Sequence, residues 1–154
     1  KILSILTLIL DTFKGFFPVF ITQKFFPEYF QISCLIVFLG HIFPLWLKFK
    51  GGKGVATYLG VLFALSYELS ILFIFTWIVV LLIFKFSSVS SIFSSLTVFI
   101  VTFFRESIGK TIIQDFDITS NLRILLFIFF ILIVFTHQKN IYNLKNKMEK
   151  KINI

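Results

Sequence analysis

Continuous apolar blocks, separated by short polar segments, make up most of this chain. Within the blocks the apolar residues neither recur with a period of 3.6 nor alternate with polar residues, so amphipathic surface helices and half-buried strands are not indicated. A membrane-crossing helix needs about 20 apolar residues, with a range of about 17–25. The pattern therefore predicts membrane-spanning helical segments at residues 2–21, 31–47, 55–64, 69–84, 87–104 and 121–136, with polar connections at 23–28 and 105–120.

The apolar run at residues 55–84 is too long for one crossing. As a single helix it would extend about 45 Å at about 1.5 Å per residue, whereas the hydrocarbon core is about 30 Å thick. Glu68, with Ser66 and Tyr67 beside it, divides the run. We therefore predict two short helical segments, of which residues 55–64 form a half-helix or cross a thinned region of the membrane.

Composition agrees with membrane helices and excludes an ordinary soluble domain. Of the 154 residues, 58% are hydrophobic and 14% are charged, whereas soluble domains are about 25% charged. Only helices and closed barrels satisfy their backbone hydrogen bonds in lipid, and the blocks lack the alternation of barrel strands. We expect an all-α, polytopic integral membrane helical bundle with about six spans, forming a single membrane domain over residues 1–154.

The formal net charge of +8 is distributed unevenly around the predicted spans. If residues 55–84 cross twice, the cations on one side are Lys1, Lys48, Lys50, Lys53, Lys85, Lys139, Lys145, Lys147, Lys150 and Lys151. The opposite side then holds Lys24, Arg105, Lys110 and Arg123. The positive-inside tendency places the lysine-rich side in the cytoplasm. Because these lysines flank apolar segments, we expect anionic lipid or phosphate ligands and no nucleic acid.

A segment rich in glycine and lysine, KFKGGKGVAT at residues 48–57, interrupts the apolar pattern. Its glycines at 51, 52 and 54 allow close backbone approach and positive φ, and successive amides in such a turn can bind an anion. It leads into a predicted helix start, where unpaired N–H groups favour phosphate, and Lys50 and Lys53 add charge. It is not a Walker A loop, because Gly54 follows Lys53. The segment predicts a phosphate site or, alternatively, a turn with lysines among the lipid headgroups.

Ionisable residues within the predicted spans are further candidates, because burying them in lipid is costly and they are usually functional. Asp11 and Lys14 are three residues apart and share one helix face, so we expect them to form a mutual pair, with either a structural role or a role at the site. His41 lies towards the cytoplasmic end of its span. It is either a hydrogen-bonded packing residue or a member of the site.

Two other features have mainly structural interpretations. The serines of residues 85–96 are expected to permit close helix packing or to bond back to their own helix. Gly15 and Pro18 indicate a close helix contact or a kink. The lone Cys34 is expected to be a packing residue, since one cysteine permits neither an intrachain disulfide nor a cysteine metal cluster.

The C-terminal segment HQKNIYNLKNKMEKK, at residues 137–151, follows the last apolar block. His137 is a candidate general base, because an imidazole titrates near neutral pH. Asn140 is a candidate for orienting that histidine or binding a ligand. The alternative is a juxtamembrane tail whose lysines bind anionic lipid.

Four segments resemble the bacterial acyl-phosphate:glycerol-3-phosphate acyltransferases, the PlsY family. GHIFPLWLKFKGGKGVAT, at residues 40–57, matches every fixed position of the family's glycine-rich block. LTLILDTFKGFFPV, at 6–19, is similar to the family's second span with its D-x-x-K-G, and KFSSVSSI, at 85–92, is similar to its serine segment. HQKNI, at 137–141, followed by Glu149, is similar to its last block. The resemblance covers nearly the whole chain.

The resemblance implies transfer of an acyl group from acyl phosphate to the 1-hydroxyl of glycerol 3-phosphate, giving lysophosphatidic acid and phosphate without a cofactor or metal. The implied binding residues for glycerol 3-phosphate are His41, Lys50, Gly51, Gly52, Lys53, Gly54 and Thr57. His137 and Asn140 would serve the active site, and the implied structural or site-supporting residues are Asp11, Lys14, Ser88, Ser91 and Glu149. We also expect contacts with membrane lipids, a monomer, and an active site on the cytoplasmic face of the bacterial cytoplasmic (inner) membrane.

Two departures from the family pattern bear on these expectations. The family's first span and first block, which carries a Ser and an Arg at the active site, would lie upstream of Lys1, so the family's seven spans become six here. In the last block, Asn143 stands at an arginine position and Lys147 at a glycine position. Two alternatives stay open: a membrane anion or phosphate transporter that uses the same loop, and an inactive truncated remnant of the acyltransferase.

Overall fold

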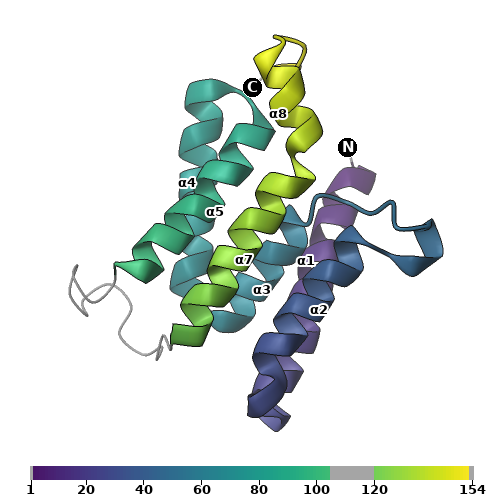
Figure 1. The fold of residues 1–154 in the computed structure, drawn as a ribbon, viewed down its shortest axis with the longest axis vertical. Helices are drawn as coiled ribbons and strands as arrows, with labels where there is room; N and C mark the ends of the chain where they lie inside the picture. Colours follow the sequence, from purple (N-terminus) through teal and green to yellow (C-terminus); the bar gives the residue numbers. More distant parts are fainter. Residues whose placement is uncertain (1, 105–119, 153–154) are drawn as a thin grey trace. The chain divides into compact units, whose positions relative to one another are not determined.

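All regular elements of the described residues are helices (Figure 1). The structure is a computed structural model that describes residues 2–104 and 120–152. Its elements are α1 (Ile2–Phe25), η1 (Pro27–Tyr29), α2 (Phe30–Ile42), η2 (Leu45–Leu47), α3 (Val55–Leu65), α4 (Tyr67–Phe84), α5 (Ser87–Phe103), α7 (Ser120–Thr136) and α8 (Gln138–Lys145). The predicted apolar blocks are helical, except that the block at 31–47 is interrupted at Phe43 and Pro44, between α2 and η2. The predicted all-α class is confirmed.

Helix length gives fewer membrane crossings than the charge pattern predicts. Among the described residues three segments are long and apolar enough to cross, namely Ile2–Phe25, Pro27–Leu47 and Tyr67–Phe84, and a fourth is added if α7 and α8, bent by 55°, count as one span. The apolar helices Val55–Leu65 and Ser87–Phe103 are shorter. Six crossings therefore stay a prediction. The connection at 105–120, apart from Ser120 where α7 begins, lies outside the described residues, as do Lys1, Arg105 and Lys110 of the charge count.

The break predicted within residues 55–84 is present at Ser66. Its backbone is extended, with φ −165° and ψ 129°, and it separates α3 from α4. The Ser66 hydroxyl accepts the N–H of Leu69 at 3.3 Å and donates to the Glu68 carboxylate. Serine at this position caps the new helix, because its side chain takes up a donor that the first turn leaves unpaired.

The chain divides into two compact units, Lys1–Ser70 and Ile71–Ile154, which are described separately. In the first unit α1 packs on α3 and α2. Glycine allows the close approach of α1 and α3: a Cβ on Gly60 would lie 2.8 Å from the Phe16 nitrogen, and one on Gly15 would collide with the Thr57 carbonyl oxygen. Small residues bring transmembrane helices together in this way. The close contact expected at Gly15 is confirmed, and α1 continues through Pro18.

In the second unit α5 packs on α7, and α8 follows α7 directly. The α5 serines are largely buried, and several bond back to their own helix, as Ser90 does to the Phe86 oxygen at 3.0 Å and Ser94 to the Ser90 oxygen at 2.6 Å. The Trp77 indole N–H donates to Ser91 Oγ at 3.2 Å and so joins α4 to α5. The packing and back-bonding expected of this serine segment are confirmed.

Candidate functional site

The glycine- and lysine-rich loop is folded back onto the end of α2. The helix ends at Ile42, and the chain turns through η2 before it returns. On its return, the Gly51 N–H donates to the Ile42 carbonyl at 3.1 Å and the Gly52 N–H donates to the His41 carbonyl at 3.3 Å. These two bonds fix the middle of the loop against the helix end, because they use carbonyls that the last turn of α2 leaves unpaired.

The loop needs its glycines for two different reasons. A Cβ on Gly51 would collide with the His41 and Ile42 carbonyl oxygens, and one on Gly52 would collide with the His41 ring. Gly54 is left-handed, with φ 81°, and a Cβ there would lie 2.6 Å from Phe38 Cε2. Of the two properties for which glycine was expected here, positive φ is used at Gly54, and close backbone approach is used at Gly51 and Gly52, where the neighbour is α2.

His41 faces α1 with one ring nitrogen and the loop with the other. Its Nδ1 lies 3.5 Å from Asp11 Oδ1, with the His41 side chain 12% exposed and that of Asp11 28% exposed. Its Nε2 lies against Gly52, where a Cβ would collide with it. The imidazole therefore connects the first helix with the loop.

The mutual pair predicted between Asp11 and Lys14 is not found among the described residues. Asp11 instead contacts His41 of α2, and Lys14 Nζ lies 5.7 Å from the centre of the Trp46 ring, within the range of a cation–π contact. The physical reason is that packing of α2 on α1 offers each charge a partner outside its own helix. Residue spacing along one helix contains no information on such partners.

The loop presents positive charge and backbone donors at its surface. Lys50, Gly51, Gly52 and Lys53 are exposed, whereas Gly54 is buried. The helix α3 starts at Val55 without a side-chain cap, so its first-turn N–H groups are not taken up by a capping side chain. Such a helix start beside two lysines favours an anion such as phosphate.

Thr57, in the first turn of α3, adds an unusual polar group. Its side chain is fully buried, and its Oγ1 has no hydrogen-bond partner within the described part of the chain. Buried hydroxyls normally have a partner, because leaving one unpaired costs about 1–3 kcal/mol. An oxygen atom of a ligand would satisfy this hydroxyl.

A second polar cluster joins the C-terminal segment to α5 in the second unit. Glu149 Oε1 accepts a hydrogen bond from Ser88 Oγ at 2.6 Å and another from Asn140 Nδ2 at 2.8 Å. The Ile152 N–H donates to the Lys85 carbonyl at 2.8 Å. Asn140 thus uses its amide on Glu149, and no hydrogen bond between Asn140 and His137 is found among the described residues. The Glu149 carboxylate therefore attaches α8 and the segment after it to the start of α5.

His137 lies at the bend between α7 and α8. It is 1% exposed, and its Nδ1 lies 2.8 Å from the Ile133 carbonyl oxygen. A carbonyl only accepts, so Nδ1 carries the proton and, in the neutral ring, Nε2 carries the lone pair. His137 stays a candidate general base by residue type, because an imidazole titrates near neutral pH.

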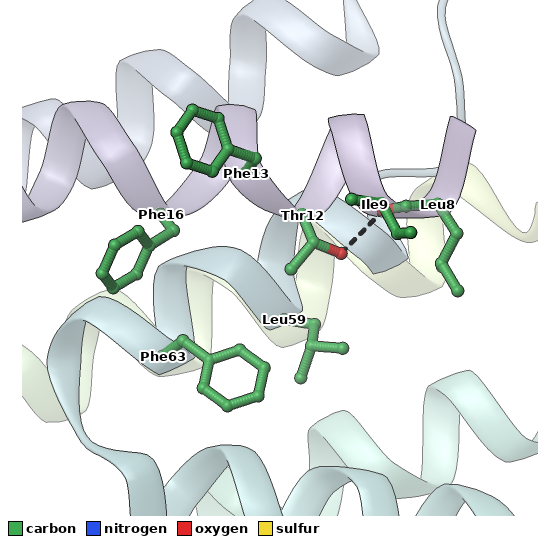
Figure 2. Close-up of a pocket in the computed structure, with 7 residues that line it drawn as sticks. All are labelled: Leu8, Ile9, Thr12, Phe13, Phe16, Leu59 and Phe63. Atoms are coloured by element: carbon green, nitrogen blue, oxygen red, sulfur yellow. Dashed lines mark hydrogen bonds between the residues drawn. The ribbon is translucent and has the colours of Figure 1, made fainter. Parts of the chain in front are cut away.

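Each unit has a pocket lined by described residues. In the first unit an apolar pocket of about 420 Å³ is lined by Leu8, Ile9, Thr12, Phe13, Phe16, Leu59 and Phe63 (Figure 2). The Thr12 hydroxyl bonds to the Leu8 carbonyl at 2.8 Å, so the lining presents an apolar surface. In the second unit a pocket of about 380 Å³ is lined by Phe86, Leu144, Lys147, Glu149 and Lys151. The described residues contain no group of three or more His, Cys, Asp or Glu side chains placed to hold a metal ion.

The structure thus brings together two sets of predicted residues, Asp11 with His41 and Gly52, and Ser88 with Asn140 and Glu149. All of these residues were predicted as candidates, but their contacts were not. The available signal was that Asp11, His41, Ser88, Asn140 and Glu149 are polar residues within or next to long apolar blocks, and polar residues need a partner when buried.

Comparisons with known proteins agree along almost the whole chain. Residues 1–147 match the family described as glycerol-3-phosphate acyltransferase. A glycerol-3-phosphate acyltransferase of Pelagibacter ubique (strain HTCC1062) is 43% identical over 154 residues, which are 100% of this chain and 74% of that protein. One of Wolbachia pipientis subsp. Culex pipiens (strain wPip) is 39% identical, over 98% of this chain and 74% of that protein.

Two solved structures have the same fold. They are crystal structures of PlsY (YgiH), an integral membrane glycerol 3-phosphate acyltransferase, in a glycerol 3-phosphate form and a lysophosphatidic acid form. The glycerol 3-phosphate form aligns with a TM-score of 0.86 and 29% identity, covering 99% of this chain and 72% of that chain. The lysophosphatidic acid form aligns with a TM-score of 0.85, covering 99% of this chain and 74% of that chain.

Proposed function

This chain belongs to the glycerol-3-phosphate acyltransferase family, and on that premise we propose that it transfers an acyl group from an acyl phosphate to the 1-hydroxyl of glycerol 3-phosphate. The products are lysophosphatidic acid and inorganic phosphate. The protein is a multi-pass membrane protein. The observation that carries the proposal is the exposed loop with Lys50 and Lys53, which offers charge and backbone donors to a phosphate group. The transporter and remnant alternatives are not favoured by the comparisons.

The acceptor is assigned to the first unit. The phosphate of glycerol 3-phosphate binds at Lys50, Lys53 and the amides that lead into α3, because a dianion is stabilised by positive charge and helix-start donors together. The buried Thr57 hydroxyl completes this set, whereas the Gly51 and Gly52 N–H groups donate to the Ile42 and His41 carbonyls and so hold the loop on α2. Asp11 and Lys14 support the site through His41 and Trp46.

The chemical step needs no nucleophile from the enzyme, because an acyl phosphate is already an activated donor. The 1-hydroxyl oxygen attacks the acyl carbon, a new ester C–O bond forms, and the C–O bond to phosphate breaks with release of inorganic phosphate. The hydroxyl proton passes to a substrate phosphate oxygen or to a general base, for which His137 is the candidate by residue type. Within the second unit Glu149 bonds Ser88 and the amide of Asn140, the other candidate of the C-terminal segment, and Trp77 bonds Ser91 of α5.

The setting proposed for this reaction is the cytoplasmic face of a bacterial cytoplasmic membrane. The lysine-rich predicted side supports that orientation, and an acyl donor with a long chain requires access from the lipid. The residues 1–154 are proposed to act as one membrane domain and as a monomer.

The test is turnover by the purified full-length gene product in lipid nanodiscs. With palmitoyl phosphate we expect release of inorganic phosphate only when glycerol 3-phosphate is present, with lysophosphatidic acid in equal amount by mass spectrometry. Glycerol, which lacks the phosphate group, is the matched control and should not be acylated. Phosphate release without ester formation, or no release at all, would contradict the proposal. Flux of labelled phosphate into liposomes without ester formation would instead identify a transporter.

A further inference from the structure

Asp11 Oδ1 of α1 and His41 Nδ1 of α2 lie 3.5 Å apart, so a carboxylate and an imidazole meet where these two helices pack. Both residues lie within segments long and apolar enough to cross a membrane. An ionisable group in such a segment is costly unless it is paired, and it usually marks a functional position. Placing these two ionisable residues in apolar segments therefore costs free energy, which points to a functional role for them.

His41 is in contact with the phosphate-binding loop through both its backbone and its ring. Its carbonyl oxygen accepts the Gly52 N–H at 3.3 Å. Its Nε2 lies so close to Gly52 that a Cβ there would collide with the ring. Rotation of the imidazole would therefore displace the loop backbone or leave a gap beside it.

Asp11 lies beside the other nitrogen of this ring. Its Oδ1 lies 3.5 Å from Nδ1, the ring nitrogen opposite the loop. Lys14, one turn further along α1, lies near the Trp46 ring. An acceptor on one ring nitrogen sets the orientation of an imidazole and so determines what the other nitrogen presents.

We propose that Asp11 is a positioning residue for acceptor binding: it holds the His41 ring, and the ring holds the Gly51–Gly52 turn in the conformation that binds the phosphate group of glycerol 3-phosphate. Asp11 itself does not contact the substrate. The inference rests on the proposed function for its kinetic readout. Its structural content, that Asp11 controls the loop through His41, is independent of turnover.

The first experiment compares Asp11→Asn with Glu28→Gln in the full-length protein. Both variants change a carboxylate to an amide, and Glu28 lies in η1 outside the proposed site. Asp11→Asn should raise the KM for glycerol 3-phosphate about tenfold, equivalent to about 1.4 kcal/mol, with kcat within about twofold of wild type. Asp11→Glu, which keeps the carboxylate, should recover most of the affinity. An equal KM in Asp11→Asn and Glu28→Gln, or a fall in kcat alone, would overturn the proposal.

The second experiment is a double-mutant cycle with His41→Gln. If Asp11 acts through His41, then Asp11→Asn should change the KM little once His41 is replaced, so the two effects should not add. Additive effects would overturn the proposal, because they would mean that the residues act independently.

The third experiment separates this inference from the proposed function, because it requires no turnover. Amide hydrogen exchange of the peptide that contains Gly52 should be faster in Asp11→Asn than in wild type, and unchanged in Glu28→Gln. If wild type makes no lysophosphatidic acid but the exchange responds as expected, the proposed function fails and the positioning role stands. Unchanged exchange in Asp11→Asn would overturn the positioning role even in an active enzyme.

Discussion

At the scale of single residues, space rather than charge is the most restrictive property of the loop. Lysines at its surface are exposed, whereas Gly51 and Gly52 each lie against atoms of His41 with no room for a side chain. This loop conformation therefore depends on the absence of a Cβ at both positions. A lysine at a neighbouring position could supply the same positive charge, but no residue with a side chain would permit this close approach of the backbone.

Gly51→Ala is expected to weaken acceptor binding strongly. The new Cβ would meet two backbone carbonyl oxygens and lie 2.6 Å from Pro44 Cδ, and backbone cannot move aside cheaply. Overpacking of this kind costs about 1–3 kcal/mol, so the KM for glycerol 3-phosphate should rise about tenfold or more.

Gly40→Ala is the matched control, because a Cβ at Gly40 has nothing within 4 Å. In a helix interior this change should stabilise by about 0.5–1 kcal/mol and leave the KM unchanged. Both variants are compared by steady-state kinetics and thermal unfolding in detergent. A similar KM in the two variants would show that the loop tolerates a side chain.

Much of the residue-level site was predictable, because glycine, lysine and histidine in an apolar chain are conspicuous. The contacts were not predictable. Asp11 and Lys14 satisfy a local spacing rule, yet the partner of Asp11 is thirty positions further along the chain, at His41. A spacing rule describes one helix, whereas the partner of a charge is decided by which helix packs beside it.

At the scale of elements, the lengths of the apolar blocks predicted the helices well. The polar residues within the run at 55–84 predicted the break at Ser66. Helix ends follow local chemistry, so they can be read from the sequence. The attachment of the C-terminal segment to α5 was not evident, because Ser88 and Glu149 are 61 residues apart and neither is unusual in its own segment.

Ser88→Ala should destabilise the second unit, because it removes one of two hydrogen bonds to Glu149 Oε1. Hydrogen bonds to charged groups contribute about 1.5–3 kcal/mol, and we expect the lower end because Glu149 is only half-buried. Ser94→Ala is the control: it removes a bond to a carbonyl of its own helix, and should cost less than about 1 kcal/mol. Thermal unfolding in detergent measures both. Equal losses of stability in the two variants would show that the hydrogen bond to the Glu149 carboxylate contributes no more than a hydrogen bond to a carbonyl.

At the scale of the whole molecule, charge placement carries information that helix length does not. Helix length alone supports three or four crossings, whereas the lysine distribution predicts that residues 55–84 cross twice. The two arguments differ because the length of a short helix such as α3 does not decide whether it crosses the membrane. The lysines near the helix ends, in contrast, indicate on which side of the membrane each end lies.

Single cysteines introduced at Lys48, Lys145 and Glu28 test the crossings, in a Cys34→Ala background. A membrane-impermeant maleimide should label the cysteines at Lys48 and Lys145 in inverted vesicles, and the cysteine at Glu28 in right-side-out cells. All three native positions are exposed. Labelling at Lys48 and Lys145 from opposite sides would mean that residues 55–84 cross only once.

The glycines have a consequence at the level of the gene. Every glycine codon begins with two guanines, whereas phenylalanine, isoleucine, lysine and asparagine have codons made mostly of A and T. The chain holds 24 Phe and only 7 Gly, the balance expected of a gene rich in A and T. Under that bias, glycine persists where a side chain cannot fit, and Gly15, Gly51, Gly52, Gly54 and Gly60 all lack room for one. In such a gene these five glycine codons mark positions where a side chain has no room, and Gly40 is an exception among the described glycines.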